Sequence, residues 1–286
     1  MADRTTVKRL EKAALQTRIW LLELCHKGKI HIGGDMSCCD LMTLIWQHLM
    51  RYDTANPKWE ERDRFVLSKG HAAAVTSFSQ AAIGCYAVED IFAEYATNFG
   101  RFGMHSCNLH NPYVDVSTGS LGHGFPVAGG VARQLKVKGL DSRVYCVLGD
   151  GECEEGSVWE AAMSSSKYKL DNLIAFVDRN RMSFDGCTEE LMPLEPFADK
   201  WRAFGWNVIE VPDGNDMAQL LDAAASVQET AKGRPTVLIC NTVKGKGVSF
   251  MENQKKWHTG VLSDEQLKQA KDELYSAYQK KWGEAV

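Results

Sequence analysis

The sequence predicts one α/β domain over residues 1–286, built on a mostly parallel sheet with helices on both faces. Short apolar runs alternate with longer amphipathic segments along the whole chain. These apolar runs lack polar alternation, which is typical of strands buried on both faces. Segments that alternate in this way form parallel sheets with right-handed crossovers. No Pro/Ser-rich linker and no internal repeat divides the chain, so we expect a single domain.

The first half of the chain is expected to supply one strand and four helices. The first helix should end at Gly28, with Lys27 in its last turn, as helix C-termini commonly do. The expected elements are, in order, a helix over 6–27, a loop over 31–35, a helix over 41–49, a strand over 64–67, an Ala-rich helix after 71, and a Gly-rich turn over 117–124 that opens a helix to about 138.

The second half should add four strands and end with a helix. Ser263 is followed three residues later by Gln266, which is the signature of a capping box at a helix start. The expected strands cover 144–148, 173–177, 207–211 and 236–240, and the expected helices cover 157–168, the region near 199, 217–231 and the tail from 263.

Composition and charge exclude several classes of protein. The net charge is -4 and the pI about 6.1, so no basic footprint for nucleic acid is present. No apolar run is long enough to span a bilayer, and the N-terminus lacks a secretory signal. The nine cysteines form no C-x-x-C pair, which indicates reduced thiols and argues against a zinc site. We therefore expect a cytoplasmic protein.

A carboxylate and an amide follow two neighbouring strands of the predicted sheet. Asp150 lies between Gly149 and Gly151 after the first strand, and Asn180 follows the next one. Turn residues of these types are common at strand ends. Together, however, they offer two hard oxygen ligands for one divalent cation, and the carbonyl of Met182 could complete a Mg²⁺ site. Because Gly151 leaves the backbone bare, a phosphate could approach it, so the pattern predicts a metal diphosphate site.

Neither common nucleotide fingerprint accompanies this site. The pattern G-x-G-x-x-G fails because position 154 is Glu, and G-x-x-x-x-G-K-[ST] is absent. A diphosphate site without a Rossmann or P-loop signature points away from NAD and ATP.

Histidines and a lysine in Gly-containing loops are further candidates. A lone loop histidine is usually solvated, but several that converge on one sheet edge could hold diphosphate and sugar oxygens and carry protons. Lys244 follows a strand and is either a solvated basic turn or a flexible loop that brings a cation to phosphate. The histidines concerned are His31, His71, His105 and His258.

The motif from Gly149 to Asn180 resembles that of thiamine diphosphate enzymes, and the whole chain resembles the N-terminal half of transketolase. Split bacterial transketolases divide the polypeptide at this point, and the chain is similar to their N-terminal subunit. The matching stretches are 63–72, 117–122, 178–186 and 244–247, with Trp257 and His258 beyond them.

The resemblance implies a role for each matching position. Asp150, Asn180 and the Met182 carbonyl would hold Mg²⁺ or another divalent cation. His31, His105 and His258 would hold hydroxyls of a ketose donor, and the resemblance gives His31, His71, His105 and His258 as catalytic. The positions expected to contact thiamine diphosphate are His71, Gly119, Ser120, Leu121, Asp150, Gly151, Glu152, Asn180, Lys244 and His258.

The resemblance also implies a partner. In this family a carboxylate from a second, pyrimidine-binding domain activates the cofactor, and no segment of this chain resembles that domain. We expect an enzyme that transfers a two-carbon ketol unit from a ketose (phosphate) to an aldose. It would be active only with a C-terminal transketolase subunit, in an α2β2 heterotetramer. Glu155 matches a family glutamate that communicates across the dimer interface.

Three departures from the family pattern lie where substrate would be bound. Ile32 and Ser106 replace the prolines that usually follow the site histidines, the stretch 107–112 is unusual, and His123 stands where Gln is common. The ordinary pentose-phosphate substrates are therefore in question. The alternatives are the alpha subunit of a 2-oxoacid dehydrogenase, a deoxyxylulose-phosphate synthase type of enzyme, or a non-catalytic cofactor-binding interaction protein.

Overall fold

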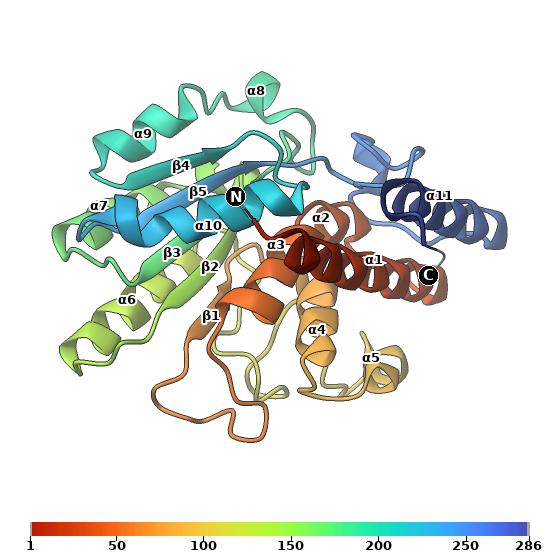
Figure 1. Cartoon of the computed structure of the whole chain (residues 1–286), viewed down its shortest axis with the longest axis horizontal. Coiled ribbons are helices and arrows are strands. Elements are labelled where there is room, and N and C mark those ends of the chain that lie inside the picture. The colour runs from red at the N-terminus through yellow and green to blue at the C-terminus, as the bar shows by residue number, and fades with distance from the viewer. Residues whose placement is uncertain (1, 285–286) are drawn as a thin grey trace.

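The computed structural model describes residues 2–284 and contains a five-stranded, fully parallel sheet (Figure 1). The strand order is β1-β2-β3-β5-β4, and every neighbouring pair is parallel. The strands are β1 Arg64–Leu67, β2 Val144–Gly149, β3 Leu173–Arg179, β4 Asn207–Val211 and β5 Thr236–Asn241. The predicted fold class is confirmed.

The apolar strand sequences explain why the sheet is covered on both faces. Every residue of β2 and β3 is buried. Within β2, Tyr145 and Val147 join one hydrophobic cluster, whereas Cys146 and Leu148 join another. Successive side chains of a strand point to opposite faces, so each face buries its own apolar set.

Helices form a layer on each face of the sheet (Figure 1). One cluster is formed with side chains of α1 Arg4–Lys27, α2 Ile32–Ser37, α3 Cys39–Leu44, α4 Ala73–Ala82, α5 Val88–Glu94, α10 Met217–Ala231 and α11 Asp264–Trp282. The other is formed with α6 Gly124–Val137, α7 Gly156–Lys167 and α9 Phe197–Ala203. A short helix, α8 Thr188–Leu191, follows β3.

The predicted capping box at the tail helix is confirmed. The Ser263 hydroxyl accepts a hydrogen bond from the Gln266 amide N–H, and the Gln266 side chain accepts one from the Ser263 amide. Each bond satisfies an N–H that has no partner within the helix.

The loop predicted over 31–35 is wrong, because α2 begins at Ile32. The two glycines that suggested a loop serve close packing instead. A Cβ on Gly33 would lie 2.6 Å from the Trp257 carbonyl oxygen, and one on Gly34 would lie 3.3 Å from the His71 ring. The helix predicted over 41–49 divides into α3 and a wider turn over Ile45–Leu49, and α5 and α8 were not predicted.

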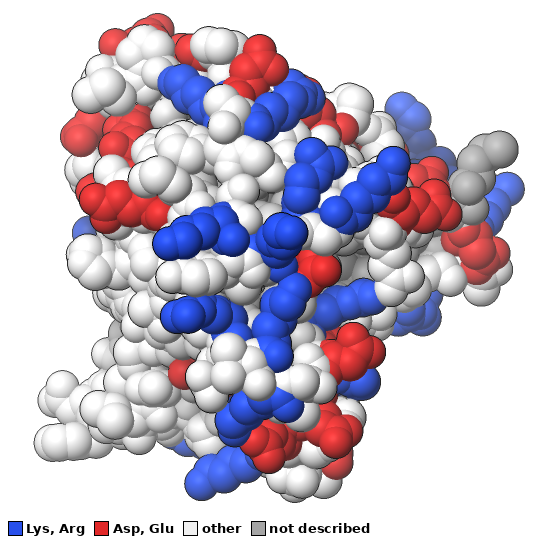
Figure 2. Space-filling view, turned by 90° about the vertical axis from the view of Figure 1, so that its left-hand side faces the viewer, with Lys and Arg blue, Asp and Glu red and all other residues white. Residues whose placement is uncertain are grey.

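Basic side chains gather at the edge of the sheet where the strands begin (Figure 2). The last turns of α6 and α7 carry Lys136 and Lys167, and that of α9 carries Lys200 and Arg202. Helices that cross over a parallel sheet end at this edge, where cations complement the negative ends of their dipoles. No described helix is long and apolar enough to cross a membrane.

Candidate functional site

A cavity of about 560 Å³ lies at the carboxyl ends of the strands, where ligands of open parallel sheets are expected. Segments from across the sequence meet there. Its lining includes Gly34, Lys69, His71, His105, Gly119, Leu121, Asp150, Gly151, Glu152, Asn180, Met182, Lys244 and His258. The structure thus brings most of the predicted site residues to one place.

Asp150 is buried immediately after β2. Its Oδ1 accepts a hydrogen bond from the Gly151 amide at 2.8 Å, and its Oδ2 accepts one from the Arg181 amide at 2.5 Å. The Arg179 guanidinium lies 3.2 Å from the same Oδ2. Burial and the neighbouring Asp178 carboxylate nevertheless raise the pKa of Asp150 to about 6. The carboxyl group therefore sits where more positive charge would stabilise it.

Asn180 is buried beside Asp150 and has a defined amide orientation. Its Nδ2 donates to Asp178 Oδ2 at 3.0 Å, and its Oδ1 accepts from the Met182 amide at 3.1 Å. The Asp150 carboxylate, the Asn180 amide oxygen and the Met182 carbonyl form an all-oxygen donor set that suits Mg²⁺. Residues 2–284 contain no cluster of three or more His, Cys, Asp or Glu that could hold a metal, so any cation here would depend on such mixed donors.

Lys244 is buried rather than solvated. Its ammonium lies 3.3 Å from the Met182 carbonyl, 3.0 Å from the Ser183 carbonyl and 3.0 Å from His258 Nδ1. Burial and the nearby Lys69 lower the pKa of Lys244 to about 8. The flexible loop expected at this position is therefore wrong: the structure fixes a desolvated cation against the cavity.

The four candidate histidines converge. The His31 ring centroid lies 5.5 Å from that of His71 and 5.6 Å from those of His105 and His258. Burial, with the positive charges nearby, lowers the pKa of His31 to about 4 and that of His258 to about 3, and it lowers the pKa of His71 well below its ordinary value. These three imidazoles are therefore neutral at pH 7 and can both donate and accept hydrogen bonds.

The Gly-rich turn brings bare backbone against the strand-end loops. A Cβ on Gly70 would lie 2.7 Å from the Gly119 amide nitrogen, and one on Gly119 would lie 3.5 Å from the His105 ring. Gly119 and Leu121 line the cavity, whereas Ser120 is exposed and is not among the lining residues. The structure therefore offers no geometric support for a cofactor contact by the Ser120 side chain.

Glu152 ties three strand-end segments together. Its buried carboxylate accepts hydrogen bonds from the Ser68 hydroxyl, from the Gly122 amide at 2.9 Å and from the Gly149 amide at 3.1 Å. Because both carboxylate oxygens are engaged with the protein, the contacts in the structure are those of a scaffold for the turns. Its predicted contact with the cofactor stays a prediction.

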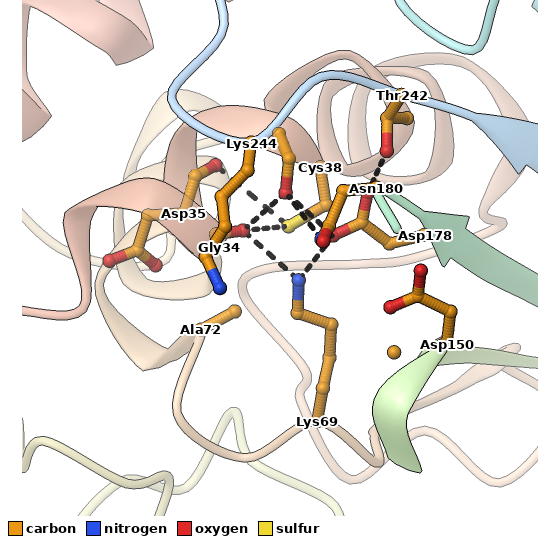
Figure 3. A network of polar contacts seen from close by, with 12 residues as sticks. Gly34, Asp35, Cys38, Lys69, Ala72, Asp150, Asp178, Asn180, Thr242 and Lys244 are labelled. Carbon is orange, nitrogen blue, oxygen red and sulfur yellow. Dashed lines mark hydrogen bonds and ion pairs between the residues drawn. The ribbon is translucent and has the colours of Figure 1, made fainter. Parts of the chain in front are cut away.

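A buried ionic layer beneath these residues was not predicted. Lys69 and Asp178 form an ion pair of 2.5 Å, and Arg179 contacts Asp150, Glu189 and Glu195 (Figure 3 shows the first pair). Burial would raise the pKa of Asp178, but Lys69 and two hydroxyl donors hold it below its ordinary value. The available signal was the charged pair Asp178-Arg179 inside an otherwise apolar strand.

Comparisons with known proteins agree with this geometry. The model of the family described as transketolase, thiamine diphosphate binding domain, matches residues 12–282. One of the two subunits of an apulose-4-phosphate transketolase from Phocaeicola vulgatus is 41% identical over 278 residues, covering 96% of each chain. A 6-deoxy-6-sulfo-D-fructose transketolase subunit from a Clostridium species is 39% identical over 258 residues, covering 90% of this chain and 92% of the relative.

The fold is that of solved transketolases. A transketolase from Campylobacter jejuni superposes with a TM-score of 0.84 at 25% identity, covering 96% of this chain and 43% of that one. The chain thus spans less than half of the solved enzyme, yet almost the full length of the two subunit relatives. The resemblance recognised in the sequence is confirmed: the chain belongs to the transketolase family, as a transketolase-type subunit that consists of the thiamine diphosphate binding domain.

Proposed function

We propose that the chain binds thiamine diphosphate through Mg²⁺ and carries half of a ketol-transfer site. The convergence of Asp150, Asn180, Lys244 and the histidine cluster on one cavity is the observation that supports this most. Thiamine diphosphate, when bound, supplies the carbanion chemistry needed to move a two-carbon unit from a ketose to an aldose.

The protein's contribution at the diphosphate end is charge and position. Asp150, Asn180 and the Met182 carbonyl would ligate the cation. Lys244 would donate to a phosphate oxygen from its buried position, where a charge-assisted hydrogen bond is stronger than in water. Gly151 leaves room for the diphosphate, because a Cβ there would lie 3.2 Å from the Ser183 side chain.

The histidine cluster would handle the sugar. Neutral His31 and His258 can each accept a hydrogen bond from a hydroxyl or donate one to a carbonyl oxygen. His105 is exposed at the entrance of the cavity, where a donor ketose would arrive. This arrangement suits a substrate with several hydroxyls more than a short oxoacid.

A partner chain would complete the site. The two relatives that match over their whole length are named as subunits, which supports a second polypeptide. Large apolar side chains also stand exposed among the cavity-lining residues, at 61% for Phe184, 50% for Leu191 and 58% for Met192. Exposed apolar groups at a cavity entrance mark interaction surfaces. A pyrimidine-domain chain that covers them, in an α2β2 assembly, would shield the cofactor from water.

The substrate pair would lie outside the ordinary pentose phosphates. The relatives' names specify apulose-4-phosphate and 6-deoxy-6-sulfo-D-fructose, both unusual ketoses. In this chain Ser106 follows His105, and residues 107–112 depart from the usual family pattern close to the cavity entrance. We propose a ketose with a distal anionic group as the donor or product.

The test is reconstitution. The purified chain with thiamine diphosphate and Mg²⁺ should bind the cofactor but show no ketol transfer from either ketose to an aldose acceptor. Addition of the pyrimidine-domain subunit encoded beside it should restore turnover. Robust transfer by the chain alone would contradict the shared site, and absence of cofactor binding would contradict the proposal as a whole.

A further inference from the structure

A buried carboxylate that is not itself a metal ligand lies directly behind Asn180. Asp178 is fully buried near the end of β3. Its Oδ2 accepts hydrogen bonds from Ser37 Oγ at 2.6 Å and Lys69 Nζ at 2.5 Å, and its Oδ1 accepts one from Thr242 Oγ1. The Asn180 amide supplies a fourth donor, at 3.0 Å. A carboxylate has about four lone-pair positions, so none is left for a cation.

The four donors arise from different parts of the fold. Lys69 follows β1, Thr242 follows β5, and Ser37 ends α2, while Asp178 itself lies in the central strand β3. Figure 3 shows the Lys69 ammonium pointing toward the side chains of Asp178 and Asn180. Lys69 also donates to the Gly34 carbonyl at 3.0 Å, so the ammonium is held in place from two sides.

This arrangement decides which way the Asn180 amide faces. An ionised carboxylate can only accept hydrogen bonds, so the amide must present its NH₂ group to Asp178. The amide oxygen is then directed away from Asp178, where it accepts from the Met182 amide at 3.1 Å. A flipped amide would oppose two oxygen atoms and direct its NH₂ group away from Asp178, so it could not ligate a cation.

We propose that Asp178 is a positioning residue for the metal: it fixes the Asn180 amide with its oxygen available for coordination. Lys69 compensates the buried charge of Asp178, which lets a second carboxylate, Asp150, stand close by. Partners that orient a metal ligand typically contribute about 10- to 100-fold to metal affinity. The inference rests on the proposed function, because it concerns the same metal site.

The first test is Asp178→Asn, which keeps the shape but can either donate or accept toward the Asn180 amide. We expect Mg²⁺-dependent thiamine diphosphate affinity, measured by calorimetry with and without EDTA, to fall about 10- to 100-fold. Asp40→Asn is the matched control. Asp40 is a buried aspartate paired with buried Arg18 at 2.6 Å, and it does not line the cavity. Its substitution should leave the affinity within about twofold.

The second test is a rescue that a merely structural residue would not permit. Adding Asn180→Asp to Asp178→Asn places a carboxylate at position 180, which presents oxygen to the cation in either orientation. The same carboxylate can accept from the amide introduced at position 178. We expect most of the lost affinity to return. A double variant that binds no better than Asp178→Asn, with unchanged thermal melting, would overturn the inference.

A third variant covers the case in which Asp178→Asn does not fold because Lys69 is left unpaired. Lys69→Met combined with Asp178→Asn removes the buried pair together. This double variant should fold and still lose the affinity; wild-type affinity in it would overturn the inference. If the wild-type chain itself shows no Mg²⁺-dependent binding, the proposed function fails, and the inference fails with it.

Discussion

The floor and the rim of the cavity are built in opposite ways. The floor, formed by Lys69, Asp150, Asp178 and Asn180, is almost completely buried, and each of its side chains is held by hydrogen bonds from other elements. The rim is exposed and carries polar and apolar groups without a common pattern: His105, Phe184, Leu191 and Met192.

The difference indicates a division of labour. A site that binds a charged group with little rearrangement needs preorganised dipoles and charges, which the floor supplies. A surface that meets a second chain and a variable sugar needs accessible side chains, which the rim supplies. Substitutions in the floor should therefore change cofactor binding, and substitutions in the rim should change substrate use or assembly.

Replacing the floor carboxylate should have the largest effect. Asp150→Asn is expected to weaken Mg²⁺-dependent thiamine diphosphate binding by at least about 100-fold, since even the partners of metal ligands contribute up to that amount. The fold should survive because Arg179 keeps Glu189 at 2.5 Å and Glu195 at 3.1 Å. Calorimetric titration measures the loss, and Asp185→Asn, an exposed carboxylate lining the same cavity, is the control. Equal affinity in both variants would remove Asp150 from the metal site.

Lys244→Met should act next most strongly, and with opposite signs on binding and stability. Losing a charge-assisted hydrogen bond to phosphate costs about 1.5–3 kcal/mol, or roughly 10- to 100-fold in affinity. Without cofactor, the variant should be more stable than wild type, because burial lowers the pKa of Lys244 to about 8 and so disfavours its charged form. Cofactor titration and urea unfolding give the two readouts. The control is Lys246→Met, two residues away and partly exposed; a wild-type response at Lys244 would contradict the account.

A rim substitution should separate substrate from cofactor. His105→Ala in the reconstituted enzyme is expected to raise KM for the ketose about tenfold, the worth of one hydrogen bond, with thiamine diphosphate affinity unchanged. His110→Ala removes an exposed histidine that does not line the cavity and should change neither value. Loss of cofactor binding without a change in KM would place His105 in the floor.

The smallest expected effect is a pH dependence of stability. The pKa of His31 is lowered from 6.5 to about 4 by burial, so the folded chain keeps it neutral while the unfolded chain protonates it. Its contribution to stability is complete above pH 6.5 and is lost as the pH falls toward 4. Urea unfolding between pH 7 and about 4.5 should show a shallower decline for His31→Asn, by about one proton taken up on unfolding. Parallel curves for the two proteins would contradict the assignment.

The floor ligands could be predicted from the sequence, but their support could not. Asp150 and Asn180 follow adjacent apolar strands, and the carboxyl ends of parallel strands share one edge, so local pattern was enough. The pairing of Lys69 with Asp178 joins residues 109 positions apart, and no local pattern encodes it. The glycines at 33 and 34 suggested a loop, whereas tertiary packing against Trp257 and His71 explains them within a helix.

The rim shows a similar limit. The histidines were candidates because of their loops, but only the fold brings His31 within 5.6 Å of His105 and His258, ring centroid to ring centroid. The burial of Lys244 was also invisible in its Gly-flanked sequence, which equally suited a solvated turn.

The most direct test of the preorganised floor is a crystal structure of the chain with Mg²⁺ and thiamine diphosphate. We expect one cation held by Asp150, the oxygen of the Asn180 amide and the Met182 carbonyl at about 2.1 Å, with diphosphate oxygens completing the shell. Asp178 should stay bonded to Lys69 and to the Asn180 NH₂ group. A cation bound elsewhere, or an Asn180 side chain turned away from it, would contradict the account.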